Sequence, residues 1–453
     1  MTDQFDGQRA YEHIQALSVE IGARVSGTEE ENSAAEYVRK QLEMYGLHPS
    51  VMSFKADNEN AVSFRLEILE PAIGEVYSLP LVGTPDTPPE GLSGEIVFAE
   101  FPQEPYVGPH VEGKIVFLVN GGILGGNLRK LLKYNPLALV LVGRNVGQEP
   151  HTFHVIRKQG NKPFELVPTM HITYEDGIRL WNAKAKRARL QLETKRSSGS
   201  SCAVVGEVTG SQFPDEIIVI AGHMDSVPRD PGATDNAAGV ATVLELARLF
   251  ALRGSKRTLR FAAWGSEEGS GAGSLKYVLE LKKKHKEQHE AEDYVEGYSK
   301  TELEKHLLNI NLDVLGMSLG SNACYVQCPQ AMVEYVKALS CELGVHHEIK
   351  TEPYGSDNLN FGWVGIPALS FAREGVGTQY MHTLRDDITL IDARQLEVIG
   401  RMLDVFITRT AAQGVVWPFD RSMPEMPPER KKDFDGFIRQ VAAWMGEDLE
   451  LVS

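Results

Sequence analysis

Apolar and polar residues follow two different periods along this chain. Over residues 8–47 the apolar positions recur at helical spacing, except in the stretch GARVSGTEE at 22–30. This pattern predicts two helices separated by a loop. Residues 61–71, AVSFRLEILEP, alternate between apolar and polar side chains and predict a strand.

From about residue 201, short apolar runs alternate with longer amphipathic stretches. The runs have the length of strands, and the amphipathic stretches have the length of helices with one apolar face. The predicted strands are 216–223, 258–265, 306–313 and 366–374, and the predicted helices are 236–252, 273–286, 330–344 and 392–413. Such alternation predicts an α/β fold with a mixed, mostly parallel sheet flanked by helices.

The segment between these two parts has a different character. Residues 75–195 are rich in proline and glycine and contain short β-like runs, which predicts an inserted β-rich domain. The larger domain would then comprise 1–74 and 196–420. Residues 421–453 form a C-terminal extension, with a proline-rich linker and then an amphipathic helix that we expect to dock on the main body or on a partner subunit.

Composition and charge argue against some classes of binding partner. The formal net charge of -16 would repel phosphate, which argues against a nucleic-acid or anionic-membrane partner. No run has the roughly 18 apolar residues that a membrane span needs, and the first thirty residues lack the pattern of a signal peptide. We therefore expect a cytoplasmic protein. Cys324 and Cys328 form a lone C-x-x-x-C, which is more simply two thiols than a zinc site.

Metal-ligating residue types follow the predicted strands of the second half or begin the helix after the first strand. They are His223, Asp225, Asp235, Glu267, Glu268, Asp313 and His382. A single histidine or glutamate pair in such a place is ordinary. When such residues recur after successive strands they indicate a common site, because the carboxyl ends of parallel strands meet at one edge of the sheet.

Clustered carboxylates repel one another, and burying them without compensation costs several kcal/mol each. Divalent cations remove this cost. The mixture of imidazole and carboxylate suits zinc, with cobalt or manganese as substitutes. The sequence therefore predicts a metal centre at the carboxyl edge of the sheet.

The second half resembles the M28 family of di-zinc aminopeptidases, which also includes glutamate carboxypeptidase-type enzymes, in the motifs GHMDS, ATDNAAGVATVLELAR, FAAWGSEEGSGAGS, NLDVLGM, YGSDN, GIPALSF and MHTLRDD. The N-terminal helices are also similar to that family. Residues 75–195 resemble the protease-associated domain that is often inserted there. The resemblance implies a zinc-exopeptidase-like fold and a peptide substrate.

The resemblance also implies a role for each residue of the centre. Asp235 would bridge two Zn²⁺ ions, His223 and Asp313 would complete one site, and Glu268 and His382 would complete the other. Two metal ions that share a carboxylate and a water lower the pKa of that water.

Three further roles follow from the same resemblance. Glu267 would act as general base and then as general acid, which its position beside a ligand allows. Asp225 would orient His223 and fix its tautomer. Tyr354 would stabilise the oxyanion.

Two motifs depart from the usual pattern of the family. Its SDH is SDN here, at 356–358, and its HTPxDT is HTLRDD, at 382–387. The five ligand positions and the base are not affected, so these changes bear on the substrate pocket and its surroundings.

Three functions remain open from the sequence. The first is an aminopeptidase, and the second is a carboxypeptidase or dipeptidase of the same family, which would need a cationic pocket for a terminal carboxylate. Arg229, Arg373 and Arg385 lie near the motifs but are more simply salt-bridge partners. The third is a non-catalytic scaffold, which predicts missing ligands. The chain could also form a homo-oligomer.

Overall fold

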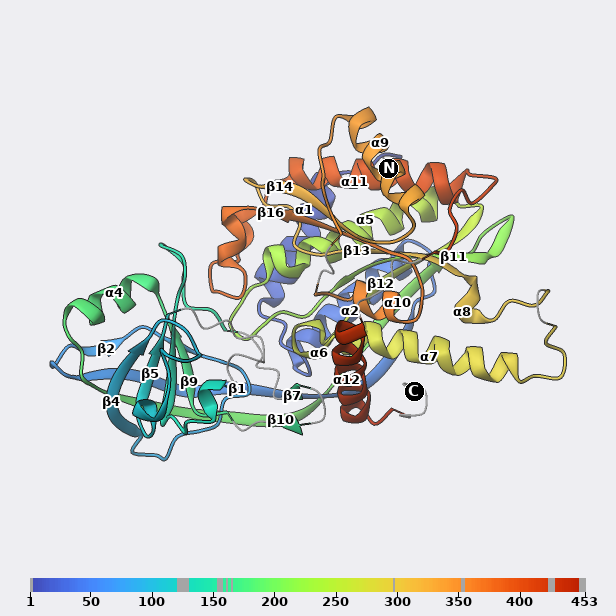
Figure 1. Cartoon of the computed structure of the whole chain (residues 1–453). Coiled ribbons are helices and arrows are strands. Elements are labelled where there is room, and N and C mark those ends of the chain that lie inside the picture. The colour runs from blue at the N-terminus through green and yellow to red at the C-terminus, as the bar shows by residue number, and fades with distance from the viewer. Residues whose placement is uncertain are drawn as a thin grey trace. The chain divides into compact units, whose positions relative to one another are not determined.

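The computed structural model describes residues 3–119, 130–152, 158–159, 162–163, 166–295, 298–351, 355–422 and 428–447 (Figure 1). The chain divides into two compact units. The larger unit comprises residues 1–56, 199–428 and 438–453, and the smaller unit comprises 57–198 and 429–437. The inserted segment therefore begins near residue 57 instead of 75. The reason is that the predicted strand 61–71 is part of a longer strand, β1 (Ser50–Glu70), which leaves the larger unit at residue 56.

The sheet of the larger unit is mixed, with a parallel centre. Its strand order is β15-β14-β16-β13-β11-β12-β10. The strands β16, β13, β11 and β12 are parallel neighbours. At the two sides, β14 runs antiparallel to β16 and β10 runs antiparallel to β12, and β15 pairs with β14 in parallel. Their bounds are β10 (Arg187–Val208), β11 (Phe213–His223), β12 (Arg257–Trp264), β13 (His306–Leu312), β14 (Ser321–Gln327), β15 (Glu348–Lys350) and β16 (Ala368–Glu374). This is the predicted α/β fold, except that the sequence indicated none of the strands β10, β14 and β15.

The two faces of this sheet differ because side chains alternate along each strand. On β13, Leu308, Ile310 and Leu312 belong to the apolar core. The alternate positions Asn309 and Asn311 are buried and polar, and Asp313 follows them. On β13 one side is therefore hydrophobic, and the other leads through polar side chains to the carboxyl edge.

Helices contact this sheet from several parts of the chain (Figure 1). Helix α5 contacts β11, β12 and β13 and also packs against α1, α2 and α11, while α7 and α10 contact the sheet and each other. The helical segments of the larger unit are α1 (Gly7–Ile14), η1 (Gln15–Ile21), α2 (Glu29–Met44), η3 (Ala233–Ala237), α5 (Ala238–Arg253), α6 (Glu267–Ser270), α7 (Ala272–His289), α8 (Glu302–Lys305), α9 (Gln330–Leu343), α10 (Asn358–Trp363), η4 (Val376–Tyr380), η5 (Ile388–Leu390), α11 (Ala393–Ile407) and η6 (Thr408–Ala412). Helix α12 (Pro428–Met445) follows near the C-terminus.

The loop between the first two helices forms where the sequence predicts it. Thr28 caps α2 by accepting a hydrogen bond from the Glu31 backbone N–H, which satisfies one of the free donors at the helix start. Buried positions on α2 follow the helical period, and they are Glu31, Ala34, Ala35, Val38 and Leu42. A glutamate thus occupies the inner face of an amphipathic helix.

The smaller unit has its own sheet and core. Part of β10 pairs with β4, and β4, β5, β6 and β9 then follow in parallel, with β3 antiparallel at the end. Residues such as Phe117, Val140 and Leu190 are buried in its core. The remaining bounds are β2 (Gly74–Val76), β3 (Leu79–Pro80), β4 (Leu92–Ala99), η2 (Pro109–Val111), β5 (Ile115–Leu118), β6 (Ala138–Val142), β7 (Lys158–Gln159), β8 (Lys162–Pro163), β9 (Thr169–Ile172) and α4 (Tyr174–Asn182).

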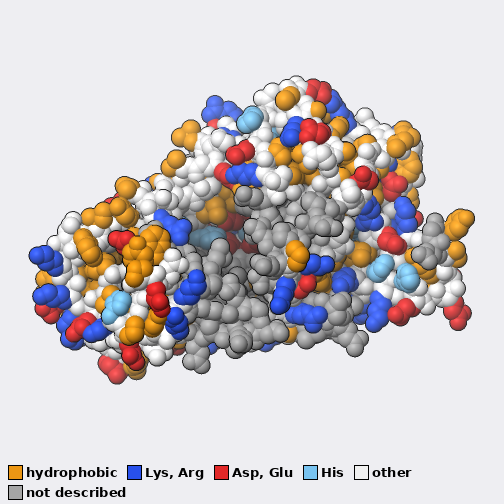
Figure 2. Space-filling model, viewed as in Figure 1, with side chains coloured by type: hydrophobic (Ala, Val, Ile, Leu, Met, Phe, Trp, Pro, Cys, Tyr) orange, Lys and Arg blue, Asp and Glu red, His pale blue; other side chains and the backbone are white. Residues whose placement is uncertain are grey.

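The surface bears charges of both signs. Lys and Arg side chains are interspersed with Asp and Glu over the face in view in Figure 2. Among the described residues, no helix combines the length and the apolar character that a bilayer crossing requires.

Candidate metal centre

The predicted residues stand at the carboxyl edge of the parallel strands. His223 is the last residue of β11, and Asp313 directly follows β13. Glu267 begins α6, three residues after β12 ends. The edge thus gathers side chains from strands that are neighbours in space but separated in sequence, as is usual for ligand sites of parallel sheets.

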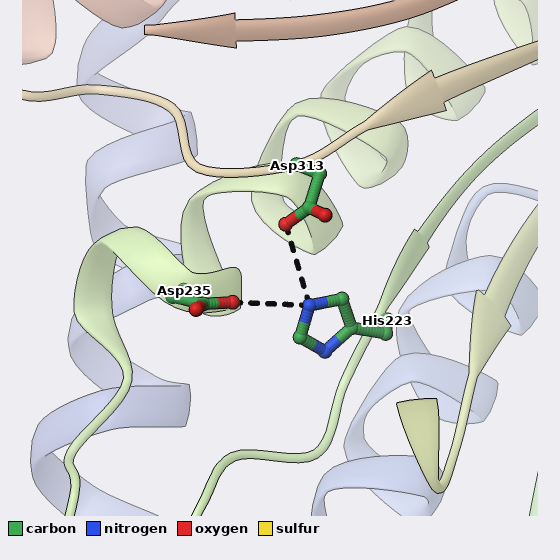
Figure 3. Close-up of side chains that lie close together, drawn as sticks. All are labelled: His223, Asp235 and Asp313. Atoms are coloured by element: carbon green, nitrogen blue, oxygen red, sulfur yellow. Dashed lines mark ion pairs between the residues drawn. The ribbon is translucent and has the colours of Figure 1, made fainter. Parts of the chain in front are cut away.

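The first group of side chains surrounds the His223 ring (Figure 3). Its Nε2 atom lies 3.1 Å from Asp235 Oδ1 and 3.3 Å from Asp313 Oδ1. All three side chains are buried. They meet from the end of β11, from η3 and from the end of β13.

The second group shares Asp235 with the first. His382 Nε2 lies 3.2 Å from Asp235 Oδ2 and 3.1 Å from Glu268 Oε2. In each group the ligand atoms lie within 4.8 Å of one another. Because Asp235 turns one carboxylate oxygen toward each histidine, it stands between two potential ion sites.

Other buried groups fix the position of Asp235. The carboxylate of Asp386 accepts hydrogen bonds from Thr234 N at 2.9 Å, Thr234 Oγ1 at 2.6 Å and Asp235 N at 2.9 Å. Asn236 Nδ2 donates to the Leu312 carbonyl at 2.8 Å. The sequence analysis assigned no role to Asp386, and its only signal is its place in the motif that contains His382.

Asp225 contacts His223 less directly than the sequence analysis expects. His223 Nδ1 donates to the backbone carbonyl of Asp225 at 3.1 Å, while the carboxylate oxygen Oδ1 lies 3.6 Å from Nδ1. The two carboxylate oxygens instead accept the backbone N–H groups of Glu267 at 2.9 Å and Glu268 at 3.2 Å. Asp225 therefore holds the start of α6 as well as facing the imidazole.

The electrostatics show an excess of buried carboxylate. Burial raises the pKa of Glu268 to about 7 and that of Asp357 to about 7. It also raises the pKa of Glu267 well above its usual range, and neighbouring acids add to this although part of the residue reaches solvent. Burial would lower the pKa of His223, but the surrounding aspartates hold it well above its usual value. Cations would relieve this imbalance.

The donor set fits zinc. Glu268 Oε1 and Asp313 Oδ1 are buried and make no hydrogen bond among the described residues, and Asp313 Oδ1 has only the ion-pair contact with His223 Nε2 at 3.3 Å. Unpaired buried carboxylate oxygens are costly, and metal coordination removes that cost. Each group offers one imidazole and two carboxylates, and three protein ligands with a position left open are typical of catalytic zinc.

The remaining residues to consider are Tyr354 and those of the SDN motif. Tyr354 lies outside the residues that the structure describes, so its assigned role stays a prediction. In the SDN motif, Asp357 is fully buried and accepts a hydrogen bond from Ser274 at the start of α7. Ser356 Oγ accepts from Asn311 Nδ2 at 3.1 Å. Ser356 thus contacts the polar side of β13, and Asp357 contacts α7.

The arginines near the motifs have other partners. Arg373 donates to the Met317 carbonyl at 2.5 Å and to Asn322 Oδ1 at 2.8 Å. Arg385 lies over the Tyr380 ring, 4.2 Å from its centroid.

Comparison with known proteins shows which family model and which relatives the chain resembles. Residues 203–407 match the model of peptidase family M28. The chain is 26% identical over 409 residues to aminopeptidase YwaD of Bacillus subtilis (strain 168), which covers 88% of this chain and 84% of the relative. It is 27% identical over 428 residues to carboxypeptidase Q of Bos taurus, with 86% and 82% covered.

Solved structures show the same fold. A peptidase M28 precursor from Shewanella amazonensis SB2B superposes with a TM-score of 0.75 at 22% identity, covering 93% of this chain and 97% of that chain. The zinc aminopeptidase BSAP from Bacillus subtilis superposes with a TM-score of 0.70 at 23% identity, covering 92% and 98%. All five predicted ligand positions lie inside residues 203–407, the range that matches the model of peptidase family M28.

Proposed function

We propose that this chain is a two-zinc aminopeptidase that removes N-terminal residues from peptides. The observation that carries the proposal is the position of Asp235, whose two oxygens face two separate histidine–carboxylate groups. His223 and Asp313 would hold one ion, and Glu268 and His382 would hold the other. When bound, a pair of zinc ions activates water and polarises the scissile carbonyl.

Glu267 is the base in this proposal. It neighbours the ligand Glu268 but belongs to neither ligand group among the described residues, which leaves its carboxylate for proton transfer. A base of raised pKa takes a proton from water more readily, and Glu267 can return that proton to the leaving amine. Asp225 holds the backbone from which this side chain projects.

An aminopeptidase fits better than an enzyme that binds a free C-terminus. Such an enzyme needs a cation for the substrate carboxylate, and Arg373 and Arg385 have the partners described above. Similarity to aminopeptidase YwaD supports the first assignment, while similarity to carboxypeptidase Q keeps the second in the test.

The proposal can be tested with purified, zinc-loaded protein. We expect two zinc ions per chain by elemental analysis, and hydrolysis of leucine p-nitroanilide but not of its N-acetylated form. Glu267→Gln should lower kcat by about 10²–10⁴-fold, the usual contribution of a general base, while keeping both ions. Loss of a zinc ion in Glu267→Gln, or retention of most activity, would contradict the division of roles between Glu267 and Glu268.

A second pair of substrates decides between the two exopeptidases. Dipeptides and tripeptides with free or amidated C-termini should be cleaved at similar rates by an aminopeptidase. Strict dependence on the free carboxylate would instead favour the carboxypeptidase or dipeptidase. Absence of both metal uptake and hydrolysis would favour a non-catalytic scaffold.

Other assignments accompany the proposal as predictions. They are the use of cobalt or manganese as substitutes, a cytoplasmic location, a possible homo-oligomer and the protease-associated character of residues 75–195.

A further inference from the structure

The turn that presents Glu267 has an unusual backbone conformation. Ser266, directly before Glu267, has φ 60° and ψ 38°, in the left-handed region. A residue with a side chain rarely adopts this region, at a cost on the order of 1–3 kcal/mol, and it persists only where surrounding contacts hold it. Something in the structure must therefore hold Ser266.

Glu31, from the second helix of the chain, makes the central contact. Its Oε1 atom accepts the Ser266 backbone N–H at 3.0 Å and the Ser201 hydroxyl at 2.7 Å. Its Oε2 atom accepts the Gly27 backbone N–H at 2.6 Å. The residue is 1% exposed, so these bonds are shielded from water.

The packing around this carboxylate leaves no spare room. A Cβ atom on Gly265 would lie 2.6 Å from Glu31 Oε1 and 2.2 Å from Ser201 Oγ. The turn therefore rests directly on the carboxylate. Ser26 Oγ, from the loop before the helix of Glu31, donates to Ser266 Oγ at 2.7 Å, so the loop and the helix together contact both the side chain and the backbone of Ser266.

Two carboxylates together bind three consecutive backbone N–H groups. Glu31 accepts the N–H of Ser266, and Asp225 accepts those of Glu267 and Glu268. Asp225 lies beside a proposed ligand, whereas Glu31 comes from a helix 235 residues earlier in the chain. The direction of the Glu267 side chain thus depends on both.

We propose that Glu31 is a positioning residue for the general base: by holding the Ser266 N–H it fixes the left-handed turn that directs Glu267 to the water it deprotonates. This inference rests on the proposed function of Glu267. It does not make Glu31 a catalytic residue, because Glu31 acts only through Ser266.

The test compares Glu31→Ala with Glu31→Gln and with the matched control Glu30→Ala, which removes an exposed glutamate from the same helix. In Glu31→Ala we expect kcat to fall about 10–100-fold at nearly unchanged KM and zinc content, because a small displacement of a reacting group has effects of this size. Glu31→Gln keeps an oxygen for Ser266 but cannot accept the Gly27 N–H. It should melt at a lower temperature yet restore most of kcat.

Two readouts separate positioning from general stability. Combined with Glu267→Gln, the Glu31→Ala change should cause no further loss of kcat, because the group that it positions is already absent. Hydrogen exchange followed by mass spectrometry should show faster exchange in peptides that contain Ser266, but not in peptides from β16.

The outcomes distinguish this inference from the proposed function. If the wild-type chain hydrolyses no peptide, the proposed function fails, and exchange at Ser266 still decides whether Glu31 holds the turn. Unchanged kcat and unchanged exchange in Glu31→Ala would overturn the inference. Should that variant not fold, Glu31→Asp, whose carboxylate is one methylene too short for Ser266, is judged by the same measurements.

Discussion

Replacing Arg24 with methionine should destabilise the larger unit strongly. The guanidinium is fully buried and donates to five backbone carbonyls. They belong to Met224, Leu17, Gly22, Pro231 and Gly232, at 2.6–3.1 Å. Methionine keeps much of the volume but leaves all five carbonyls without this donor.

The size of the effect follows from these bonds. Breaking a buried, charge-assisted network typically costs about 3–5 kcal/mol. A unit of about 300 residues unfolds with an entropy near 0.6 kcal/mol/K, so the expected fall in Tm is roughly 5–8 °C. Three of the carbonyls lie between His223 and Asp235, so the affinity for zinc should fall as well.

Scanning calorimetry of the zinc-loaded protein measures this change. The matched control is Arg39→Met, which also removes an arginine with several partners. Arg39 pairs with Glu36 and Glu43 on the surface of α2, where solvent screens the charges and such pairs contribute little to stability. If Arg24→Met lowers Tm no more than Arg39→Met does, the reasoning from buried carbonyls is wrong.

Three further predictions follow from the same structure. Asp386→Asn removes one of the acceptors that hold Thr234 and Asp235, so zinc affinity measured by chelator competition should fall about 10–100-fold, and an unchanged affinity would contradict the role given to Asp386. Burial, with the nearby Arg260 charge, lowers the pKa of His306 to about 3, so the unfolded state binds the extra proton and stability falls as pH drops below 6.5, by about 2 kcal/mol at pH 5. The slope of Tm against pH should be shallower in His306→Gln, and an equal slope would refute this assignment. Removing zinc with a chelator should lower Tm by several degrees, because binding at 1,000 times Kd contributes about 4 kcal/mol per site; equal Tm values with and without zinc would contradict binding at this centre.

Much of the fold could be predicted because the apolar residues of its helices and central strands recur at a regular spacing. The predicted strand 216–223 lies within β11, and the predicted strand 306–313 matches β13 with one further residue. The sequence missed β14 (Ser321–Gln327), where small and polar residues hide the alternation. This strand forms by pairing with β16 at the side of the sheet, a tertiary contact that local pattern does not encode.

The proximity of the candidate ligands that follow strands could also be predicted, because the carboxyl ends of neighbouring parallel strands converge at one edge of the sheet. The residues that hold these side chains in position could not be predicted from the sequence. Glu31 stands in the run EEE at the start of a helix, where acids are ordinarily solvated and favoured by the helix dipole. Its signal was its spacing from Ala34, Ala35 and Val38, which placed it on the apolar face.

These supporting contacts come from residues outside the range that matches the family model. The part of the chain that shapes the candidate centre is therefore larger than that range. The matched range, 203–407, contains the proposed ligands and base but neither Arg24 nor Glu31. Without the N-terminal segment, the Met224 and Gly232 carbonyls and the Ser266 N–H would lose the partners that now satisfy them in a buried environment. Each lost partner costs about 1–3 kcal/mol, which is comparable to the strain energy of a serine whose backbone is in the left-handed region. The N-terminal segment that contains Arg24 and Glu31 therefore contributes to the geometry of the candidate centre, together with the strands that carry the proposed ligands.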